Sequence, residues 1–340
     1  MKKEKFVKKI KLPLLVLLSN LLSCNPLTYT SKPDITEAYL TDDLFITSDG
    51  IELPLKKWPP SQQTIKNVLI ALHGFNDYSN FFQQPGNYFS QQNIISYAYD
   101  QRGFGNTLGF GSWASIETYT SDLASFIQLV RNKHPDIPLF LLGESMGAAV
   151  IISTLSQYDQ LPIAGVILVA PAVWGRKTMP WYQNMLLWTL SRTTPGLALT
   201  TKHLHIKPSD NIEMLKALHQ DPLVIKATRI RTLYGLTNLM DHALSTANLI
   251  STKTLLLYGE KDEIIPKKSM YLFLHNLTKD VAENHHMIAF YKNGYHLLLR
   301  DLEAAVLWND IDVWINANTT ALPSGADKRA QLMLGQLRKH

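Results

Sequence analysis

The pentapeptide at residues 143–147, Gly-Glu-Ser-Met-Gly, is the feature of this chain that most restricts its fold. The apolar run directly before it, residues 139–142, is typical of a buried strand, and residues 146–158 are typical of a helix. Glycines on both sides of Ser145 let neighbouring backbone approach, because glycine has no Cβ to clash with it. The pattern predicts a sharp strand-to-helix turn that presents the Ser145 hydroxyl.

Short apolar runs alternate with helical stretches along most of the chain. Strands are expected at residues 44–47, 51–58, 67–72, 94–99, 139–142, 166–169, 254–258 and 287–291. Helices are expected at residues 80–91, 115–133, 146–158, 267–277 and 300–315. This alternation favours an α/β fold with a mostly parallel central sheet and helices on both faces. The first two strands flank a Ser-Asp-Gly turn, which predicts an antiparallel hairpin at one edge.

A serine hydroxyl is a weak nucleophile at neutral pH, so Ser145 needs a base to take its proton and an acid to orient that base. For a nucleophile on a turn of this kind, the chain order is serine, acid, histidine. Asp262 is the expected acid, because it lies on the loop after the strand at 254–258. Glu260 and Glu263 lie on the same loop, and spacing alone leaves them open as alternatives.

His296 is the expected base, because it follows the strand at 287–291 and directly precedes an apolar helix. His285 and His286 precede that strand, which puts them at the opposite edge of the sheet. His242 precedes the acid in the chain and so breaks the expected order. These three are interpreted as surface or core histidines.

The negative charge that develops on a substrate oxygen needs preorganised donors. The backbone N–H groups of Met146, directly after the nucleophile, and of Phe75, in the loop after the third strand, are expected to form this oxyanion hole. His73, two residues before Phe75, is interpreted as a loop-shaping residue rather than a base. The glycines of residues 100–105 are interpreted as a structural tight turn.

The strand-helix alternation stops at Pro171 and resumes near residue 254. Within this interruption, residues 180–190 are apolar around most of a helix rather than along one stripe. An ordinary buried helix explains this pattern, and so does a part of a cap that offers an apolar surface to an acyl chain; both can hold at once. The expected organisation is a core in two parts, 43–171 and 251–316, a cap insertion at 172–250, and a C-terminal tail at 317–340 without an assigned function.

Several of these segments together resemble the monoglyceride lipase and lysophospholipase family of α/β hydrolases, over about residues 43–316. They are His73-Gly74-Phe75, residues 100–105, residues 143–147, Gly259 with Asp262, and Tyr295-His296. The resemblance implies an α/β-hydrolase fold with a helical cap insertion, hydrolysis of carboxylic esters of single-chain lipids, and no cofactor. Asp221-Pro222-Leu223 also looks like a cap feature of the family, whereas Glu144 replaces the histidine that many members have before the nucleophile.

The start of the chain looks like an export signal, with a lysine-rich stretch followed by an apolar run at 12–22 that is too short to span a bilayer. Leu-Leu-Ser-Cys at 21–24 resembles the lipobox of bacterial lipoproteins, in which the cysteine is lipidated. This resemblance implies a signal peptide at 1–23, an acylated Cys24, a tether at 24–42, and a lipid-anchored membrane lipoprotein of the bacterial cell envelope, facing the periplasm or the exterior. The alternative is that Cys24, the one cysteine of the chain, is a free thiol.

The formal net charge of +5 belongs to the leader, because residues 1–23 hold six lysines and one glutamate. The rest of the chain is neutral overall and gives no electrostatic case for binding nucleic acid. No metal-ligand spacing is apparent in the sequence, so no metal is expected, and the family resemblance implies that no cofactor is needed. The expected partners are a lipid or small ester substrate and, through acylated Cys24, the membrane.

The motifs identify a nucleophile but not the acceptor of the acyl group. The same residues could serve an acyltransferase or a short-chain carboxylesterase instead of a monoacylglycerol lipase or lysophospholipase. An alternative of another class is a noncatalytic lipid-binding surface lipoprotein on the same fold. The complete set of Ser145, Asp262 and His296 favours an enzyme, a carboxylic ester hydrolase.

Overall fold

The computed structural model describes residues 37–60, 64–200, 206–279, 286–316 and 321–337. The predicted signal peptide, Cys24, most of the predicted tether and His285 lie outside these ranges. Among the helices of the described ranges, none is long and apolar enough to cross a membrane.

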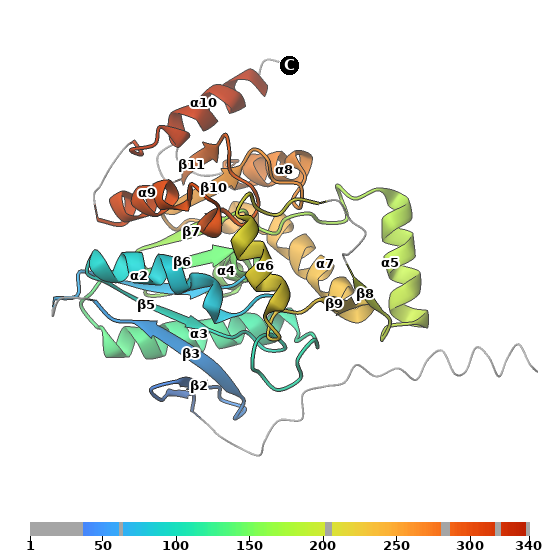
Figure 1. Cartoon of the computed structure of the whole chain (residues 1–340), viewed down its shortest axis with the longest axis horizontal. Helices are drawn as coiled ribbons and strands as arrows, with labels where there is room; N and C mark the ends of the chain where they lie inside the picture. Colours follow the sequence, from blue (N-terminus) through green and yellow to red (C-terminus); the bar gives the residue numbers. More distant parts are fainter. Residues whose placement is uncertain (1–36, 61–63, 201–205, 280–285, 317–320, 338–340) are drawn as a thin grey trace, which may run out of the picture.

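A nine-stranded sheet forms the centre of the molecule and confirms the predicted mostly parallel α/β architecture (Figure 1). Its strands, in spatial order, are β1 (Tyr39–Leu40), β2 (Leu44–Ile46), β3 (Glu52–Trp58), β5 (Ile94–Tyr99), β4 (Asn67–Leu72), β6 (Leu139–Glu144), β7 (Gly165–Val169), β10 (Thr254–Gly259) and β11 (His286–Tyr291). In this spatial order, β1, β2, β3 and β5 pair antiparallel with their neighbours. From β5 through β4 to β11, neighbouring strands pair parallel. The carboxyl ends of the parallel strands therefore meet at one edge, where loops can bring distant residues together.

Helices cover both faces of the sheet (Figure 1). One face carries α3 (Ile116–Lys133), α4 (Met146–Gln157) and α8 (Lys267–Leu277), and the other carries η2 (Ser79–Phe82), α2 (Gln83–Gln91) and α9 (Ala304–Asn316). Successive residues of β4 enter opposite cores: Val68 and Ile70 pack toward α3 and α4, and Leu69 packs toward α2 and α9. Because both faces are covered, the parallel strands are mostly apolar rather than alternating.

The last helix, α10 (Ala326–Leu337), lies in the predicted C-terminal tail and packs along the edge strand β11 (Figure 1). Its Ala330 is fully buried in the main core. An edge strand presents unpaired backbone groups, so a helix along β11 shields that side of the sheet.

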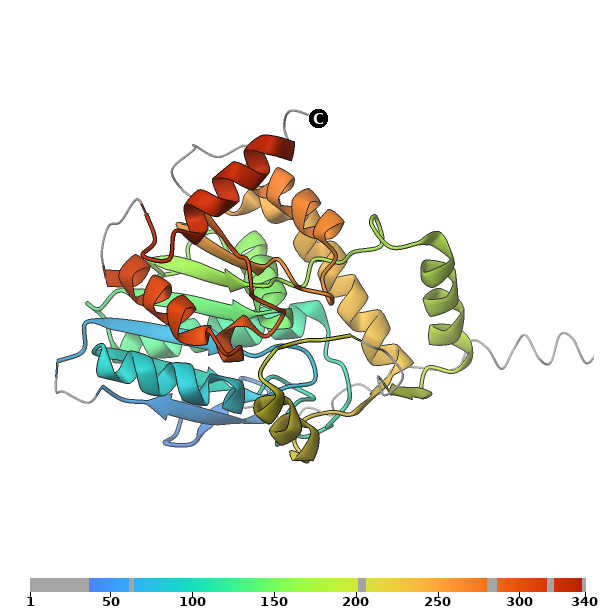
Figure 2. The same cartoon turned by 45° about the horizontal axis from the view of Figure 1, so that its top comes forward.

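The segment between β7 and β10 holds the helices outside the regular alternation. They are α5 (Trp181–Thr193), α6 (Ile212–Gln220), α7 (Ile230–Ser245) and η3 (Ala247–Leu249), with a small antiparallel pair, β8 (Ala198–Thr200) and β9 (Ala227–Arg229). α7 packs into the main core against α4 through Leu239 and Ala243. α5 contacts α7 but has no buried side chain, and it stands apart from the sheet (Figure 2). The interpretation of residues 180–190 as an ordinary buried helix is therefore wrong.

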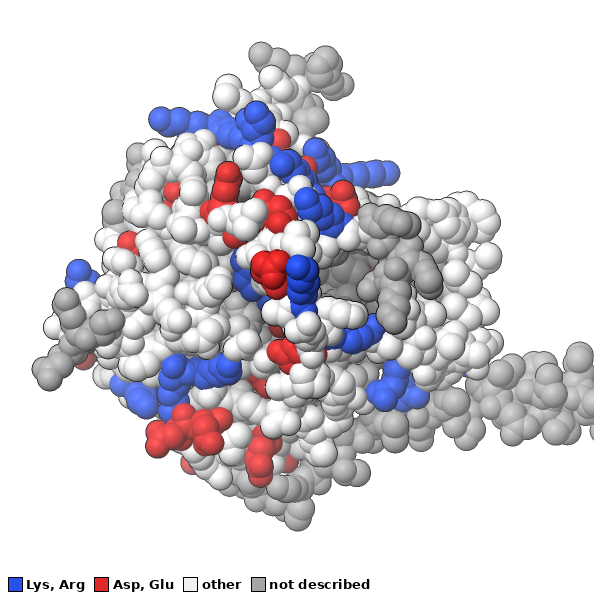
Figure 3. Space-filling model, viewed as in Figure 1, with Lys and Arg blue, Asp and Glu red and all other residues white. Residues whose placement is uncertain are grey.

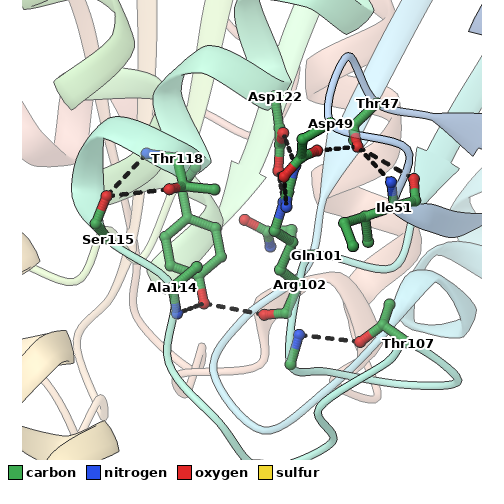
Figure 4. A network of polar contacts seen from close by, with 12 residues as sticks. Thr47, Asp49, Ile51, Gln101, Arg102, Thr107, Ala114, Ser115, Thr118 and Asp122 are labelled. Atoms are coloured by element: carbon green, nitrogen blue, oxygen red, sulfur yellow. Dashed lines mark hydrogen bonds and ion pairs between the residues drawn. The ribbon is translucent and has the colours of Figure 1, made fainter. Parts of the chain in front are cut away.

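Arg102, in the loop after β5, joins three separate segments by charge-assisted hydrogen bonds (Figure 4). Its guanidinium donates to both oxygens of Asp49, in the turn between β2 and β3, at 2.7 Å each. It also donates to both oxygens of Asp122 on α3, at 2.6 and 2.8 Å. Arg102 and Asp122 are buried, so each depends on the other to compensate its charge.

Replacement of Arg102 by leucine is expected to lower the free energy of unfolding by about 3–5 kcal/mol, because it leaves the buried Asp122 carboxylate without its cation. Urea denaturation of both proteins measures this difference. The control is Lys216→Met, which removes an ion pair with Glu213 whose side chains are 62% and 83% exposed. That variant is expected to change the stability by about 0.5 kcal/mol or less. Equal losses in the two variants would contradict the interpretation of Arg102.

Candidate active site

Ser145 lies at the turn between β6 and α4, at the carboxyl edge of the sheet. Its φ is +54° and its ψ is −111°, a backbone conformation that non-glycine residues rarely adopt. A Cβ on Gly143 would lie 2.4 Å from the amide nitrogen of Ala148, and a Cβ on Gly147 would lie 2.3 Å from the carbonyl oxygen of Leu72. Both glycines are therefore required for α4 to approach β6 and β4 this closely.

The structure brings Ser145, His296 and Asp262 into one hydrogen-bonded chain. His296 Nε2 lies 2.9 Å from Ser145 Oγ, and His296 Nδ1 lies 2.8 Å from Asp262 Oδ2. The second oxygen of Asp262 accepts from the backbone amides of Ile264 and Ile265, at 2.8 and 2.9 Å. With the Nδ1 proton directed at the carboxylate, Nε2 is free to accept the proton of the serine hydroxyl.

The electrostatic surroundings of His296 favour its protonated form. Burial lowers the pKa of His296, but the Asp262 carboxylate and its hydrogen bond raise it, and Glu144 raises it further. The result is a pKa above the ordinary value of 6.5. An imidazolium formed during a reaction would therefore be stabilised where it forms.

The two other acids of the loop are engaged elsewhere. Glu260 forms an ion pair with Arg329 of α10, with Oε2 3.0 Å from Nη2. Glu263 accepts from the backbone amide of Lys207 at 2.8 Å, at an exposed position. Asp262 is thus the acid of this loop that contacts His296.

His242 and His286 lie away from Ser145, and His73 has another role. His242 lies between α7 and α4, with Nδ1 3.0 Å from Ser153 Oγ, and His286 begins β11, at the opposite edge of the sheet. His73 is buried, and its Nε2 accepts from the backbone amide of Gln101 at 2.9 Å. The proton of His73 is therefore on Nδ1, which donates to the carbonyl oxygen of Gly74 at 2.8 Å.

This hydrogen bond orients the amide expected to bind an oxyanion. The Gly74 carbonyl and the Phe75 N–H belong to one peptide plane and point in opposite directions. Gly74 lies against the nucleophile, because a Cβ on it would be 3.4 Å from Ser145 Cβ. Met146 is the first residue of α4, where backbone N–H groups have no partner within the helix. Both expected donors therefore lie on segments that border Ser145.

A buried charge cluster beside Ser145 is a part of the site that the sequence did not reveal. Arg300, in η4 (Leu298–Arg300), pairs with Glu144 at 2.9 Å and with Asp77 at 2.7 Å. Burial raises the pKa of Glu144, and Arg300 opposes this rise. Glu144 in a buried strand signals that a cation must lie nearby, but nothing local in the sequence identifies Arg300.

The segment around Asp221 is hydrogen-bonded to the loop that follows β4. The carbonyl oxygen of Asn76 accepts from the amide of Ile225 at 2.9 Å, and its side-chain amide donates to Thr228 at 2.8 Å. Tyr78 donates its hydroxyl to Asp221 at 2.7 Å. The insertion is thus attached directly to the loop that carries Phe75.

Among the described residues, no group of three or more histidine, cysteine, aspartate or glutamate side chains could hold a metal ion. A buried serine, histidine and aspartate, on loops at the carboxyl edge of a mostly parallel sheet, define the class of the α/β hydrolases with a serine at the turn after β6.

The chain belongs to the Hydrolase_4 family, described as serine aminopeptidase, S33, which matches residues 63–303. It is 23% identical to human monoglyceride lipase over 81% of this chain and 90% of that protein. It is also 23% identical to the monoacylglycerol lipase of Mycolicibacterium smegmatis, over 78% of this chain and 93% of the relative. These matches confirm the resemblance inferred from the motifs.

Solved structures with the same fold include two lipases. The monoacylglycerol lipase of Paleococcus ferrophilus aligns with a TM-score of 0.63 at 24% identity, covering 78% of this chain and 98% of that one. A soluble variant of monoglyceride lipase from Saccharomyces cerevisiae, in complex with a substrate analogue, aligns with a TM-score of 0.67 at 20% identity, covering 87% of this chain and all of that one. The predicted α/β-hydrolase fold is confirmed.

Replacement of Gly147 by alanine is expected to destabilise the protein by about 1–3 kcal/mol, because the added methyl group collides with the carbonyl of Leu72. The control is Gly196→Ala, since a Cβ on Gly196 has nothing within 4 Å. Thermal unfolding of the two variants measures the difference. A Gly147→Ala variant as stable as Gly196→Ala would contradict the tight contact between α4 and β4.

Proposed function

We propose that this protein hydrolyses carboxylic esters of single-chain lipids, monoacylglycerol or lysophospholipid, through an acyl-enzyme on Ser145. The observation that carries the proposal is the continuous hydrogen-bonded chain from Ser145 through His296 to Asp262. The names of the human and Mycolicibacterium smegmatis relatives, monoglyceride lipase and monoacylglycerol lipase, support this substrate class.

In the proposed reaction, His296 takes the hydroxyl proton while Ser145 Oγ bonds to the ester carbonyl carbon. The carbonyl oxygen becomes an oxyanion, which the amides of Phe75 and Met146 stabilise. Collapse of this intermediate breaks the ester bond, and His296 gives its proton to the departing alcohol. Water then attacks the acyl-enzyme with His296 again acting as base, which releases the fatty acid and restores Ser145. Asp262 stabilises the imidazolium at each step.

The exposed apolar surface of α5 supports a lipid substrate. Its large apolar side chains are strongly exposed: Trp181 73%, Tyr182 54%, Met185 57%, Leu186 56% and Trp188 53%. No charged residue precedes Arg192 in the sequence of this helix. Figure 3 shows neither blue nor red atoms on the surface over it. The molecular surface is hollowed beside this area (Figure 3). Exposed apolar patches of this kind mark surfaces for lipid, ligand or protein.

The proposed catalytic residues are tested with a fluorophosphonate probe and a soluble ester. The wild type is expected to be labelled, and Ser145→Ala to lose all labelling. Asp262→Asn and His296→Ala are each expected to lower turnover by about 10³–10⁴-fold. The double variant that combines both changes is expected to lower turnover by little more than either single variant, because the residues act as a unit. Absence of labelling in the wild type would favour a noncatalytic lipid-binding protein. Full activity in Asp262→Asn would transfer the acid role to Glu260 or Glu263.

The substrate class is tested with glycerol esters and lysophospholipids whose acyl chains range from acetyl to oleoyl. Long-chain esters are expected to be cleaved fastest, and Trp188→Ser to lower oleoyl turnover about tenfold, equivalent to about 1.4 kcal/mol, without affecting acetyl esters. The matched control is Leu332→Ser, on α10, where the side chain is 71% exposed. Fastest cleavage of acetyl esters would favour a short-chain carboxylesterase. Transfer of the acyl group to an added alcohol in preference to water would favour an acyltransferase.

We also propose that Cys24 is acylated and anchors the protein in the membrane of a bacterial cell envelope. The proposal rests on the lysine-rich start, the apolar run and the Leu-Leu-Ser-Cys sequence that precedes the catalytic domain. Cells fed a labelled fatty acid are expected to incorporate the label into the wild type and not into Cys24→Ser, which should leave the membrane fraction. Equal labelling of both proteins would contradict acylation at Cys24.

A further inference from the structure

Arg300 forms two ion pairs inside the protein, beside the proposed nucleophile. Its Nη2 lies 2.9 Å from Glu144 Oε2 and 2.7 Å from Asp77 Oδ2. The three side chains are almost fully buried, with exposed fractions of 7% for Arg300, 0% for Glu144 and 10% for Asp77. At such depth, loss of the guanidinium would leave two carboxylates without a compensating charge.

The three charged residues come from the three segments that carry the proposed reacting groups. Glu144 ends β6, directly before the nucleophile. Asp77 lies in the loop after β4, two residues beyond Phe75, and Arg300 follows His296 by four residues. One guanidinium therefore joins the nucleophile strand, the oxyanion loop and the histidine loop.

We propose that Arg300 is a positioning residue that holds these three segments in their relative places through Glu144 and Asp77. The inference rests on the proposed function and deepens it, because Arg300 acts through the placement of Phe75 and His296 relative to the nucleophile. Displacement of reacting groups by about 1 Å lowers a rate by about 10²-fold. A residue that holds the three segments together therefore affects turnover more than substrate binding.

Arg300 makes both ion pairs through one atom, Nη2, which the planar and rigid guanidinium holds in a fixed direction. The ring of Phe81 lies 6.0 Å from Arg300 Cζ and restricts the guanidinium further. A lysine ammonium would preserve the charge but not the planar arrangement. Arg300→Lys therefore separates the positioning of the segments from their electrostatics.

The cluster also has an electrostatic effect on His296 that a purely structural contact would lack. The charged groups that act most strongly on His296 are Asp262, Glu144 and Arg300. Burial lowers the pKa of His296, the two carboxylates raise it, and Arg300 lowers it. His296 must be neutral to accept a proton, so activity rises as the pH passes this pKa. Neutralisation of Glu144 should move that rise to lower pH.

The experiment compares Arg300→Lys, Glu144→Gln, Asp77→Asn and the double variant Asp77→Asn with Glu144→Gln. The control is Arg131→Lys, because Arg131 donates to the carbonyls of Ile137 and Pro162, which precede β6 and β7 at the opposite edge of the sheet. A soluble short-chain ester gives kcat and KM. Titration with the fluorophosphonate gives the concentration of folded active sites, and thermal unfolding gives the stability of each variant.

Arg300→Lys is expected to lower kcat per titrated site by about 10²-fold, with KM changed by less than about threefold and the pH of half-maximal activity unchanged. Glu144→Gln is expected to lower kcat and to shift the pH profile to lower pH. In the double variant, the loss of kcat is expected to be smaller than the product of the losses in Asp77→Asn and Glu144→Gln. The reason is that both residues act through Arg300. Arg131→Lys is expected to change stability but not kcat.

Two results would overturn the inference. One is a kcat of Arg300→Lys equal to that of the wild type. The other is a loss of kcat in Arg300→Lys that is no greater than the loss in Arg131→Lys, when the two variants have equal thermal stability. Either of these, with a labelled and active wild type, leaves the proposed function standing. A wild type that neither reacts with the probe nor cleaves any ester would instead overturn the proposed function, and this inference with it.

Discussion

The close contact of α4 with β4 and β6 at Gly143 and Gly147 is the constraint on which the rest of the site depends. It forces Ser145 to a φ of +54°, so that the serine points out of the turn rather than along the helix. The same turn puts the amide of Met146 at the start of α4 and puts Gly74 against Ser145. The positions of the proposed nucleophile and of the proposed oxyanion donors thus follow from one packing contact. The surrounding core keeps this backbone conformation in place.

The charged side chains at the carboxyl edge of the sheet form hydrogen bonds and ion pairs that connect different loops. Asp262 accepts hydrogen bonds from two backbone amides and contacts His296, while Arg300 donates to Glu144 and pairs with Asp77. The five side chains are buried, which makes each partner necessary and each geometry specific. The strand ends bring the loops near one another, and the ionic hydrogen bonds fix how they lie. The resulting surroundings favour a protonated His296.

The insertion combines two properties that suit an enzyme acting on apolar substrates. Its α5 exposes a broad apolar surface, whereas α7 is packed against α4 within the main core. Between them, the segment near Asp221 is hydrogen-bonded to Tyr78 and Asn76 of the oxyanion loop. The insertion and the loop of Phe75 are therefore in direct contact.

The sequence by itself determined the features that depend on local pattern: the turn at residues 143–147, the parallel sheet with helices on both faces, and the order of serine, acid and histidine. Strand periodicity and glycine spacing act over a few residues, so they can be interpreted without a structure. The choice among Asp262, Glu260 and Glu263 needed the tertiary structure, because one turn carries all three and only its three-dimensional path directs Asp262 toward His296. The partnership of Glu144 with Arg300, 156 residues apart, and the exposure of α5 also needed it, because burial and ion pairing depend on which segments the whole fold brings together.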